Sequence, residues 1–146
     1  MSRIFANYLA ALKIHPELRE VYVLSEKITD AGLHPLKTFP KLEVLHLNSE
    51  TITDKGLEHV AGIPKLRDLV LFRTKATADG PAFLKKAPEL RKLTLCRIPI
   101  TSEGVAQLEE LTKLEPLGFE QLKPESREKA AELVALLPRT AITISR

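Results

Sequence analysis

Hydrophobic and polar positions recur along the chain with a period of 24 residues. Leucine marks the most regular column of this pattern, at Leu18, Leu42, Leu66, Leu90 and Leu114. Proline, glycine and threonine keep the same interval, at Pro16, Pro40, Pro64, Pro88, Gly32, Gly56, Gly80, Gly104, Thr29, Thr53, Thr77 and Thr101. Four residue types in phase indicate an internal repeat, which predicts a fold built by stacking similar units.

A short strand is predicted near the start of each unit. Val21 and Val23 lie two residues apart, which is the period of a strand whose alternate side chains face opposite sides. The equivalent pairs are Leu45 and Leu47, Leu69 and Leu71, Leu93 and Leu95, and Leu117 and Phe119. We expect these pairs to face the core. A last strand is predicted at residues 141–145, one residue out of phase with the others.

A helix is predicted after each strand, because the segment Ile28-Thr29-Asp30-Ala31-Gly32-Leu33 recurs at residues 52–57 and more loosely at 76–81 and 100–105. The threonine is expected to be the N-cap, with its hydroxyl accepting a backbone N–H of the first turn. The acids that follow are expected to stabilise the positive end of each helix; they are Asp30, Asp54, Asp79 and Glu103. The helices then bury residues at spacings of three, such as Leu33, Leu36 and Phe39.

The unit LxxLxLxxxxITDxGLxxLxxxPx, best preserved at residues 42–65, resembles the short bacterial leucine-rich repeat of the ITDxGL type, which is similar to F-box-type repeats. The resemblance implies an α/β fold: a right-handed solenoid, or horseshoe arc, with a parallel sheet of about six short strands on its concave side and helices on its convex side. One column departs from the family, because Glu26, Glu50, Thr74, Ile98 and Leu122 stand where Asn or Cys usually forms a hydrogen-bonded ladder. We expect that ladder to be absent or replaced by something irregular.

We interpret residues 1–146 as one complete leucine-rich-repeat domain; the alternative is that they are one piece of a longer protein. Residues 1–15 are predicted to be an N-terminal helical cap, because Leu9 and Leu12 precede Leu33 and Leu36 by one period. Residues 16–122 are the repeats. Residues 123–146 are a helix-strand cap, as expected for a terminal unit; its helix begins at Pro124-Glu125-Ser126, carries Ala130, Leu133, Val134 and Leu137, and closes at Pro138.

The composition places the chain in the cytoplasm. No apolar run approaches the ~20 residues of a membrane-spanning helix, and the N-terminus lacks the apolar stretch of a secretory signal. The single cysteine excludes an internal disulfide or a Cys-rich metal site. Residues 65–97 carry nine Lys and Arg against three acids, whereas the whole chain has a net charge of +3. An anionic partner is therefore an alternative, but nucleic acid is not expected, because these cations are divided between the helical and the concave side.

The strand residues that face away from the core are expected to form the working surface. Several are apolar where a solvated sheet would be polar, which is typical of an interaction site. Together with the adjoining loops, the predicted partner-binding residues are Tyr22, Leu24, Val44, His46, Val70, Phe72, Arg73, Lys92, Cys96 and Arg97. Alternatively, Leu24 and Phe72 simply pack against the loops.

The predicted sheet face is small. Six strands about 4.8 Å apart and 15 Å long give roughly 360 Å², against ~800 Å² per partner in a standard interface. The sequence therefore favours a helix or peptide of a partner protein, or a contact that extends onto the loops beside Arg73, Lys75 and Arg97. The alternatives are a self-associating structural module, as a monomer or weak homodimer, and the anionic partner named above.

Catalysis, a cofactor and a metal are not expected. Cys96 lies two strands, about 9.6 Å, from His46, beyond the ~3 Å that a nucleophile and its base require. His46 and Asp68 form a conceivable acid–base couple without any accompanying catalytic device. His15, His34 and His59 are expected to be scattered over turns and helix surfaces, and no two of them share metal-ligand spacing. Cys96 is either an accessible thiol or a half-buried structural residue.

Overall fold

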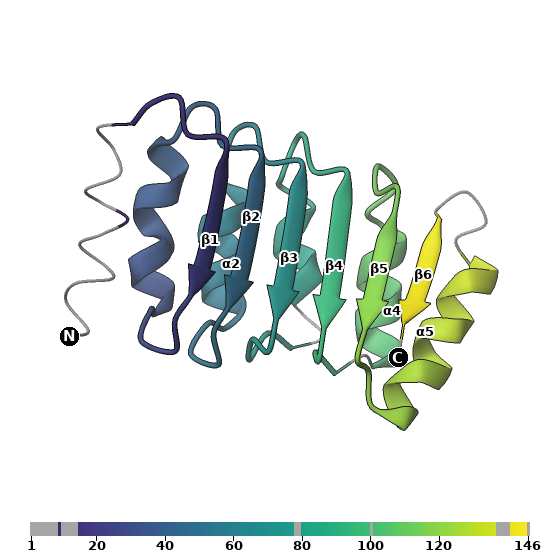
Figure 1. Cartoon of the computed structure of the whole chain (residues 1–146). Coiled ribbons are helices and arrows are strands. Elements are labelled where there is room, and N and C mark those ends of the chain that lie inside the picture. Colours follow the sequence, from purple (N-terminus) through teal and green to yellow (C-terminus); the bar gives the residue numbers. More distant parts are fainter. Residues whose placement is uncertain (1–8, 10–14, 78–79, 100, 137–140, 146) are drawn as a thin grey trace.

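The computed structural model describes residues 9, 15–77, 80–99, 101–136 and 141–145. Strands and helices alternate along the chain, and the six strands form one all-parallel sheet in the order β1 to β6 (Figure 1). Their bounds are β1 Glu20–Leu24, the 3₁₀ helix η2 Asp30–Thr38, β2 Val44–Asn48, α2 Asp54–Ala61, β3 Asp68–Phe72, α3 Gly80–Leu84, β4 Lys92–Cys96, α4 Ser102–Glu109, β5 Leu117–Glu120, α5 Pro124–Leu136 and β6 Ile142–Ser145.

The helices lie behind the sheet in Figure 1, and no described helix covers its other side, which we call the uncovered face. This arrangement confirms an α/β fold with six parallel strands. No helix among the described residues is long and apolar enough to cross a membrane.

The register of the sheet follows the sequence repeat. Glu20 pairs with Val44, Val44 with Asp68, and Asp68 with Lys92, so lateral neighbours are 24 positions apart. At the last strand the interval becomes 25, since Leu117 pairs with Ile142. The predicted phase shift of this strand is therefore confirmed.

The predicted inward-facing side chains form the core. Val21 and Val23 are 5% and 7% exposed. The other members are also buried: Leu45, Leu47, Leu69, Leu71, Leu93, Leu95, Leu117 and Phe119. Each of the strands β1 to β5 thus contributes two side chains to a layer that the helices cover.

The first helix differs from the prediction in type. Residues Asp30–Thr38 form a 3₁₀ helix with Pro35 inside it. Proline lacks an N–H and disfavours the α conformation of the residue before it, which opposes an α-helix here. Because a 3₁₀ helix has three residues per turn, Leu33 and Leu36 align on one side and are fully buried, and Phe39 directly after the helix is buried as well.

The threonine caps are confirmed at two helices and wrong at one. Thr53 Oγ1 accepts from the N–H of Lys55 at 3.3 Å, and Thr101 Oγ1 accepts from the N–H of Gly104 at 3.2 Å. Thr29 makes no side-chain cap; its backbone carbonyl instead accepts from the N–H of Gly32 at 2.8 Å, as the tighter helix requires.

A carboxylate bridge links successive helix starts. Asp30 Oδ1 accepts from the N–H of Thr53 at 2.8 Å, and Asp30 Oδ2 accepts from the Thr53 hydroxyl at 2.6 Å. Asp54 makes the same two bonds to Thr77, at 2.8 and 2.6 Å. This regular ladder lies at the helix starts and not in the Asn column, so it is a feature that the sequence analysis did not predict.

This bridge explains why glycine stands at two positions of the glycine column. A Cβ on Gly56 would lie 2.5 Å from Asp30 Oδ1, and a Cβ on Gly80 would lie 2.7 Å from Asp54 Oδ1. Only glycine leaves room for the carboxylate of the preceding unit. Here the residue is required by a close approach and not by its backbone freedom.

The two predicted caps are described in part. Apart from Leu9, which is helical and buried, the N-terminal segment of residues 1–14 lies outside the described residues. At the other end α5 begins at Pro124 as predicted and buries Ala130. Leu137 and Pro138 lie outside the described residues, as do the side chains of Leu133 and Val134.

We predict that Gly56→Ala destabilises the protein by roughly 1–3 kcal/mol, because the new methyl group overlaps the Asp30 carboxylate. An exposed helix would instead gain up to ~1 kcal/mol from the same change. Urea unfolding followed by circular dichroism measures the effect. Gly62→Ala, where the nearest atom belongs to the flexible Lys37 side chain at 3.2 Å, is the control.

Combining Gly56→Ala with Asp30→Ala tests the cause. Asp30→Ala alone removes both bonds to Thr53 and is expected to cost about 1–3 kcal/mol. The double variant should lose less than the sum of the two single variants, because the overlap with the carboxylate has gone while the contact with Ile52 Cγ2, at 2.7 Å, remains. A neutral or stabilising Gly56→Ala would contradict the bridge.

Candidate functional site

The most exposed hydrophobic side chains of the uncovered face lie on β1. Tyr22 is 57% and Leu24 71% exposed. Leu24 is thus not packed into the loop, which removes that alternative for this residue. Val44 and Val70 are half-buried beside them on β2 and β3. We call Tyr22, Leu24, Val44, Val70 and Phe72 the apolar patch.

Tyr22 is held in place by its neighbours. Its ring centroid lies 4.6 Å from that of His46, at an interplanar angle of 44°. Its hydroxyl donates to Glu20 Oε2 at 3.1 Å, and this hydrogen bond, followed by the charge of Glu20, raises the pKa of Tyr22. The patch therefore offers an oriented aromatic ring, whose binding would cost little conformational entropy.

Phe72 connects the apolar patch to the loops. The guanidinium carbon of Arg97 lies 5.5 Å from the Phe72 ring centroid, within the range of a cation–π contact. Arg97 Nε also donates to Gln121 Oε1 at 2.7 Å. Phe72 is consequently half-buried, so the packing alternative holds for it in part.

Cys96 is withdrawn from the surface. It is 1% exposed, and burial, followed by the charge of Glu120, raises the pKa of its thiol. Of the two interpretations, the structure therefore excludes the accessible thiol. Its assignment as a partner-contacting residue was wrong, because neighbouring side chains close over this part of β4.

His46 and Asp68 are engaged with different partners. Asp68 Oδ2 accepts from Lys92 Nζ at 3.0 Å, whereas His46 packs on Tyr22. Asp68 Oδ1 is buried without a hydrogen-bond partner among the described residues. Lys92, predicted to contact a partner, is thus half-exposed and already paired.

The expectation that the histidines are scattered was wrong for one pair. His34 and His59 lie on successive helices with ring centroids 5.3 Å apart in a T-shaped arrangement. Burial, followed by the positive charges of Lys37 and His34, lowers the pKa of His59. His34 and His59 are separated by one repeat plus one residue in the sequence, and this spacing could have indicated their contact. Three or more possible metal-ligating side chains do not gather anywhere in the described part of the chain.

Two kinds of turn follow the strands. After β1 and β2 the chain continues with Ser-Glu, and both glutamates, Glu26 and Glu50, are exposed. After β3, β4 and β5 the next residue has a left-handed backbone, with φ of 53° at Arg73, 56° at Arg97 and 50° at Gln121. The residue after it then points inward, and Thr74, Ile98 and Leu122 are buried. The column in which Asn was expected from the resemblance is thus filled by core residues in these later turns.

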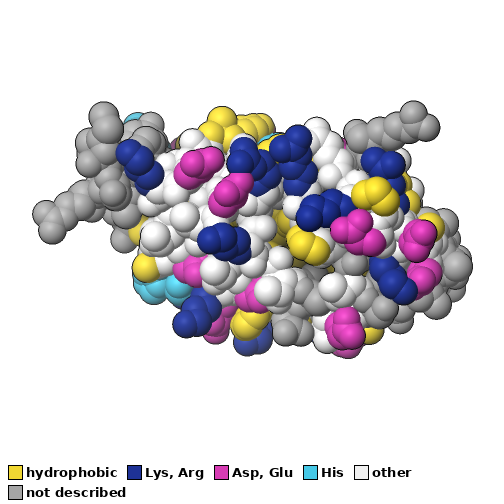
Figure 2. Space-filling view, turned by 90° about the horizontal axis from the view of Figure 1, so that it is seen from below, with side chains coloured by type: hydrophobic (Ala, Val, Ile, Leu, Met, Phe, Trp, Pro, Cys, Tyr) yellow, Lys and Arg dark blue, Asp and Glu magenta, His cyan; other side chains and the backbone are white. Residues whose placement is uncertain are grey.

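A groove of about 610 Å³ opens among these turns, and we call it the basic groove. Its charged lining residues are Arg73, Lys75, Arg97, Lys123 and Glu50. Figure 2 shows this end of the molecule, with Lys and Arg side chains gathered over it, acids between them and a hydrophobic area at its upper edge. The sequence interpretation missed Lys123, although it stands in the same column as Lys75, two periods later.

The cations of the basic groove differ in their partners. Arg73 forms an ion pair with Glu50, and Arg73 Nη2 lies 3.8 Å from Glu26 Oε1. No described carboxylate lies within ion-pair distance of Lys75, Arg97 or Lys123. The groove thus has unpaired positive charge that a ligand can meet.

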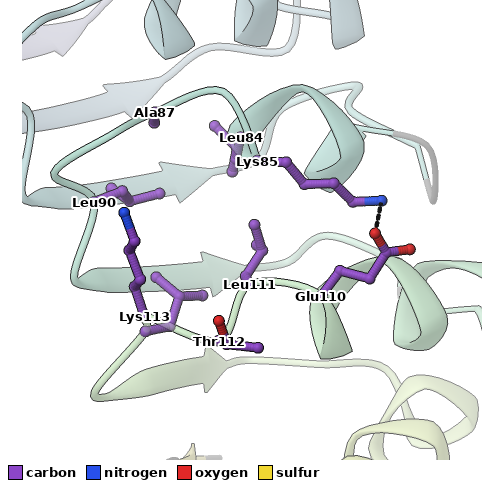
Figure 3. A pocket seen from close by; sticks show the side chains of 9 residues that line it. Leu84, Lys85, Ala87, Leu90, Glu110, Leu111, Thr112 and Lys113 are labelled. Carbon is purple, nitrogen blue, oxygen red and sulfur yellow. Dashed lines mark ion pairs between the residues drawn. The ribbon is translucent and has the colours of Figure 1, made fainter.

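A second cavity of about 290 Å³ lies between the ends of α3 and α4 (Figure 3). Buried Leu84, Leu90 and Leu111 surround it, and Lys85 Nζ pairs with Glu110 Oε2 at 2.6 Å on one side. Lys113 Nζ donates to the Pro88 carbonyl at 3.1 Å. Its two cations are therefore already engaged, unlike those of the basic groove.

No protein-family model matches the chain, and no curated protein matches its sequence.

We predict that Cys96 of the native protein reacts with a thiol reagent such as Ellman's reagent orders of magnitude more slowly than in urea, because the thiol is buried and its pKa raised. The absorbance of the released thiolate at pH 8 measures the rate. Equal rates with and without urea would contradict the burial.

We predict that His59 makes the protein less stable in mild acid. Its pKa is lowered in the folded state, so below about pH 6.5 the unfolded chain binds more protons and stability falls as pH falls. The loss in unfolding free energy between pH 7.5 and 5.5 should shrink in His59→Gln. His15→Gln, at an exposed position, should keep the wild-type loss; equal losses in the two variants would contradict the prediction.

Proposed function

We propose that the chain is a non-catalytic leucine-rich-repeat scaffold that binds one helix or extended peptide segment of a partner protein. The segment lies on the uncovered face, which is the concave side of the proposed solenoid, and reaches the adjoining loops. The observation that carries this proposal is the exposure of Tyr22 and Leu24 at 57% and 71% on a strand face without a covering helix. Large exposed apolar side chains in a contiguous patch mark interaction sites.

The leucine-rich-repeat assignment is supported by the register of the sheet. Strands that pair at a constant interval of 24 residues place equivalent leucines side by side in the core. Stacking of this kind buries a hydrophobic face that one unit could not bury alone. The carboxylate bridges at the helix starts repeat at the same interval.

The dimensions of the face favour a single segment as the partner. A surface of roughly 360 Å² accommodates a helix about 10 Å wide or one extended strand. It is too small for the ~800 Å² of a standard globular interface. The position of the patch at the β1 side, continuous through Phe72 with the loops, gives such a segment a path across the sheet.

The proposal includes no reaction. Each side chain considered for catalysis has another role: His46 supports Tyr22, Asp68 pairs with Lys92, and Cys96 is buried. Nucleophilic or acid–base catalysis requires these groups within hydrogen-bond reach of one another.

We predict that peptides selected from a displayed random library against the wild-type protein lose about 30-fold in affinity for the Tyr22→Ser, Leu24→Ser variant. This corresponds to the ~2 kcal/mol of an interface hot spot. Because both side chains are exposed, the melting temperature should stay unchanged. Biolayer interferometry with the purified proteins measures the affinities.

Ile144→Ser is the matched control, since it removes an exposed hydrophobic side chain, 40% exposed, at the opposite edge of the sheet. Selected peptides should bind this control as tightly as the wild type. Unchanged binding to the Tyr22, Leu24 variant would contradict the proposal. A dimer in light scattering that only this variant dissociates would assign the patch to self-association instead.

A further inference from the structure

We propose that the basic groove recognises carboxylates of the bound segment, so that the partner is an acidic peptide with an apolar anchor. This inference rests on the proposed function, because it assigns the chemistry of the same segment. The groove would take Asp or Glu side chains while the apolar patch takes the anchor.

The charge of the groove is the first argument. Four cations and one acid line it, and Lys75, Arg97 and Lys123 have no carboxylate partner within the described ranges. Arg97 uses Nε for Gln121 and one face of its guanidinium for Phe72. Its two terminal nitrogens have no hydrogen-bond partner among the described residues, and such a planar pair of donors matches the two oxygens of a carboxylate.

Glu50 supplies the second argument, because it is a carboxylate already bound at the edge of this groove. Its Oε1 accepts from Arg73 Nη2. The groove therefore accommodates an acidic side chain in the free protein. A second carboxylate beside Arg97 and Lys123 would repeat this contact without displacing Glu50.

The backbone of the turns is the third argument. Arg73 and Arg97 both adopt the left-handed region, which costs energy for a side chain with a Cβ and none for glycine. This conformation turns the following residue into the core and leaves the cation outside. Strained residues of this kind concentrate at ligand sites.

The distance between the groove and the patch sets the spacing of the ligand. Leu24, Asn48, Phe72 and Cys96 form one row across β1 to β4, and Arg97 of the groove directly follows Cys96. Leu24 therefore lies about 14 Å from the start of the turn that carries Arg97, a distance that an extended peptide spans in about four residues. An apolar residue and an acid about four positions apart would fit the two subsites.

The pattern of charges favours an acidic peptide over nucleic acid. Glu26, Glu50 and Glu120 are exposed at the same end of the sheet, and Figure 2 shows acids between the cations. A nucleic acid strand carries a phosphate on every nucleotide and would meet these carboxylates. A peptide with one or two carboxylates would need to contact only the cations of the basic groove.

Titration of the ¹⁵N-labelled full chain with acetylated hexaglutamate tests the groove directly. We expect amide shifts at Thr74, Lys75, Ile98 and Lys123. The Arg97→Gln, Lys123→Gln variant should bind about fivefold to tenfold more weakly, in line with the loss of two exposed ion pairs. A variant with the same change in charge on the helical side, Lys37→Gln with Lys86→Gln, should keep the wild-type affinity.

Inorganic phosphate and a ten-residue oligothymidylate, titrated at equal ionic strength, test the ligand class. The proposal is overturned by an absence of shifts in the groove with hexaglutamate, by equal weakening in the control variant, or by tighter binding of phosphate or oligothymidylate at the same amides. Weaker binding of phosphate and of oligothymidylate than of hexaglutamate supports the proposal.

The Tyr22→Ser, Leu24→Ser variant separates this inference from the proposed function. It carries the same charge as the wild type and should bind hexaglutamate equally well. Library peptides that bind this variant as tightly as the wild type would contradict the proposed role of the apolar patch. The result for the basic groove would not be affected. If library peptides bind this variant more weakly, but hexaglutamate causes no amide shifts in the basic groove, only the recognition of carboxylates would be overturned.

Discussion

In-register pairing of parallel strands determines which side chains lie beside one another across the sheet of this protein. Because the interval between neighbours is 24 residues over the first four strands, side chains interact with the equivalent position of the next unit. The ion pairs Glu17 with Lys41, Arg19 with Glu43, and Asp68 with Lys92 all span this interval. A change at one position therefore alters two lateral neighbours that lie far away in the sequence.

The same interval brings a carboxylate of one helix start onto the next, and it separates the chain into two differently built parts. Asp30 and Asp54 bridge to Thr53 and Thr77, but the next equivalent position in the sequence is Ala78. The left-handed turns begin at the same point, with Arg73. The early units are thus joined by side-chain hydrogen bonds at their helix starts, and the later turns present charge instead.

The repeat predicted the strands and the inward side chains because a period of two within a period of 24 leaves one consistent arrangement. It did not predict features that depend on distances between units. The contact of His34 with His59, the bridge from Asp30 to Thr53 and the burial of Cys96 all arise where two units meet. The apolar patch was predictable from strand alternation, whereas the turns at Arg73 and Arg97 were not, because arginine gives no local signal for a left-handed backbone.

At these two turns, the stability of the fold and the recognition of the proposed ligand favour different residues. Glycine at Arg73 or Arg97 would relieve the backbone and raise stability, but it would remove a cation from the groove. Selection for stability alone would drive these positions toward glycine or asparagine, since stabilising changes of this kind are readily accessible. The loops after β3 and β4 are therefore the places where engineering a more robust protein would first erode its proposed ligand preference.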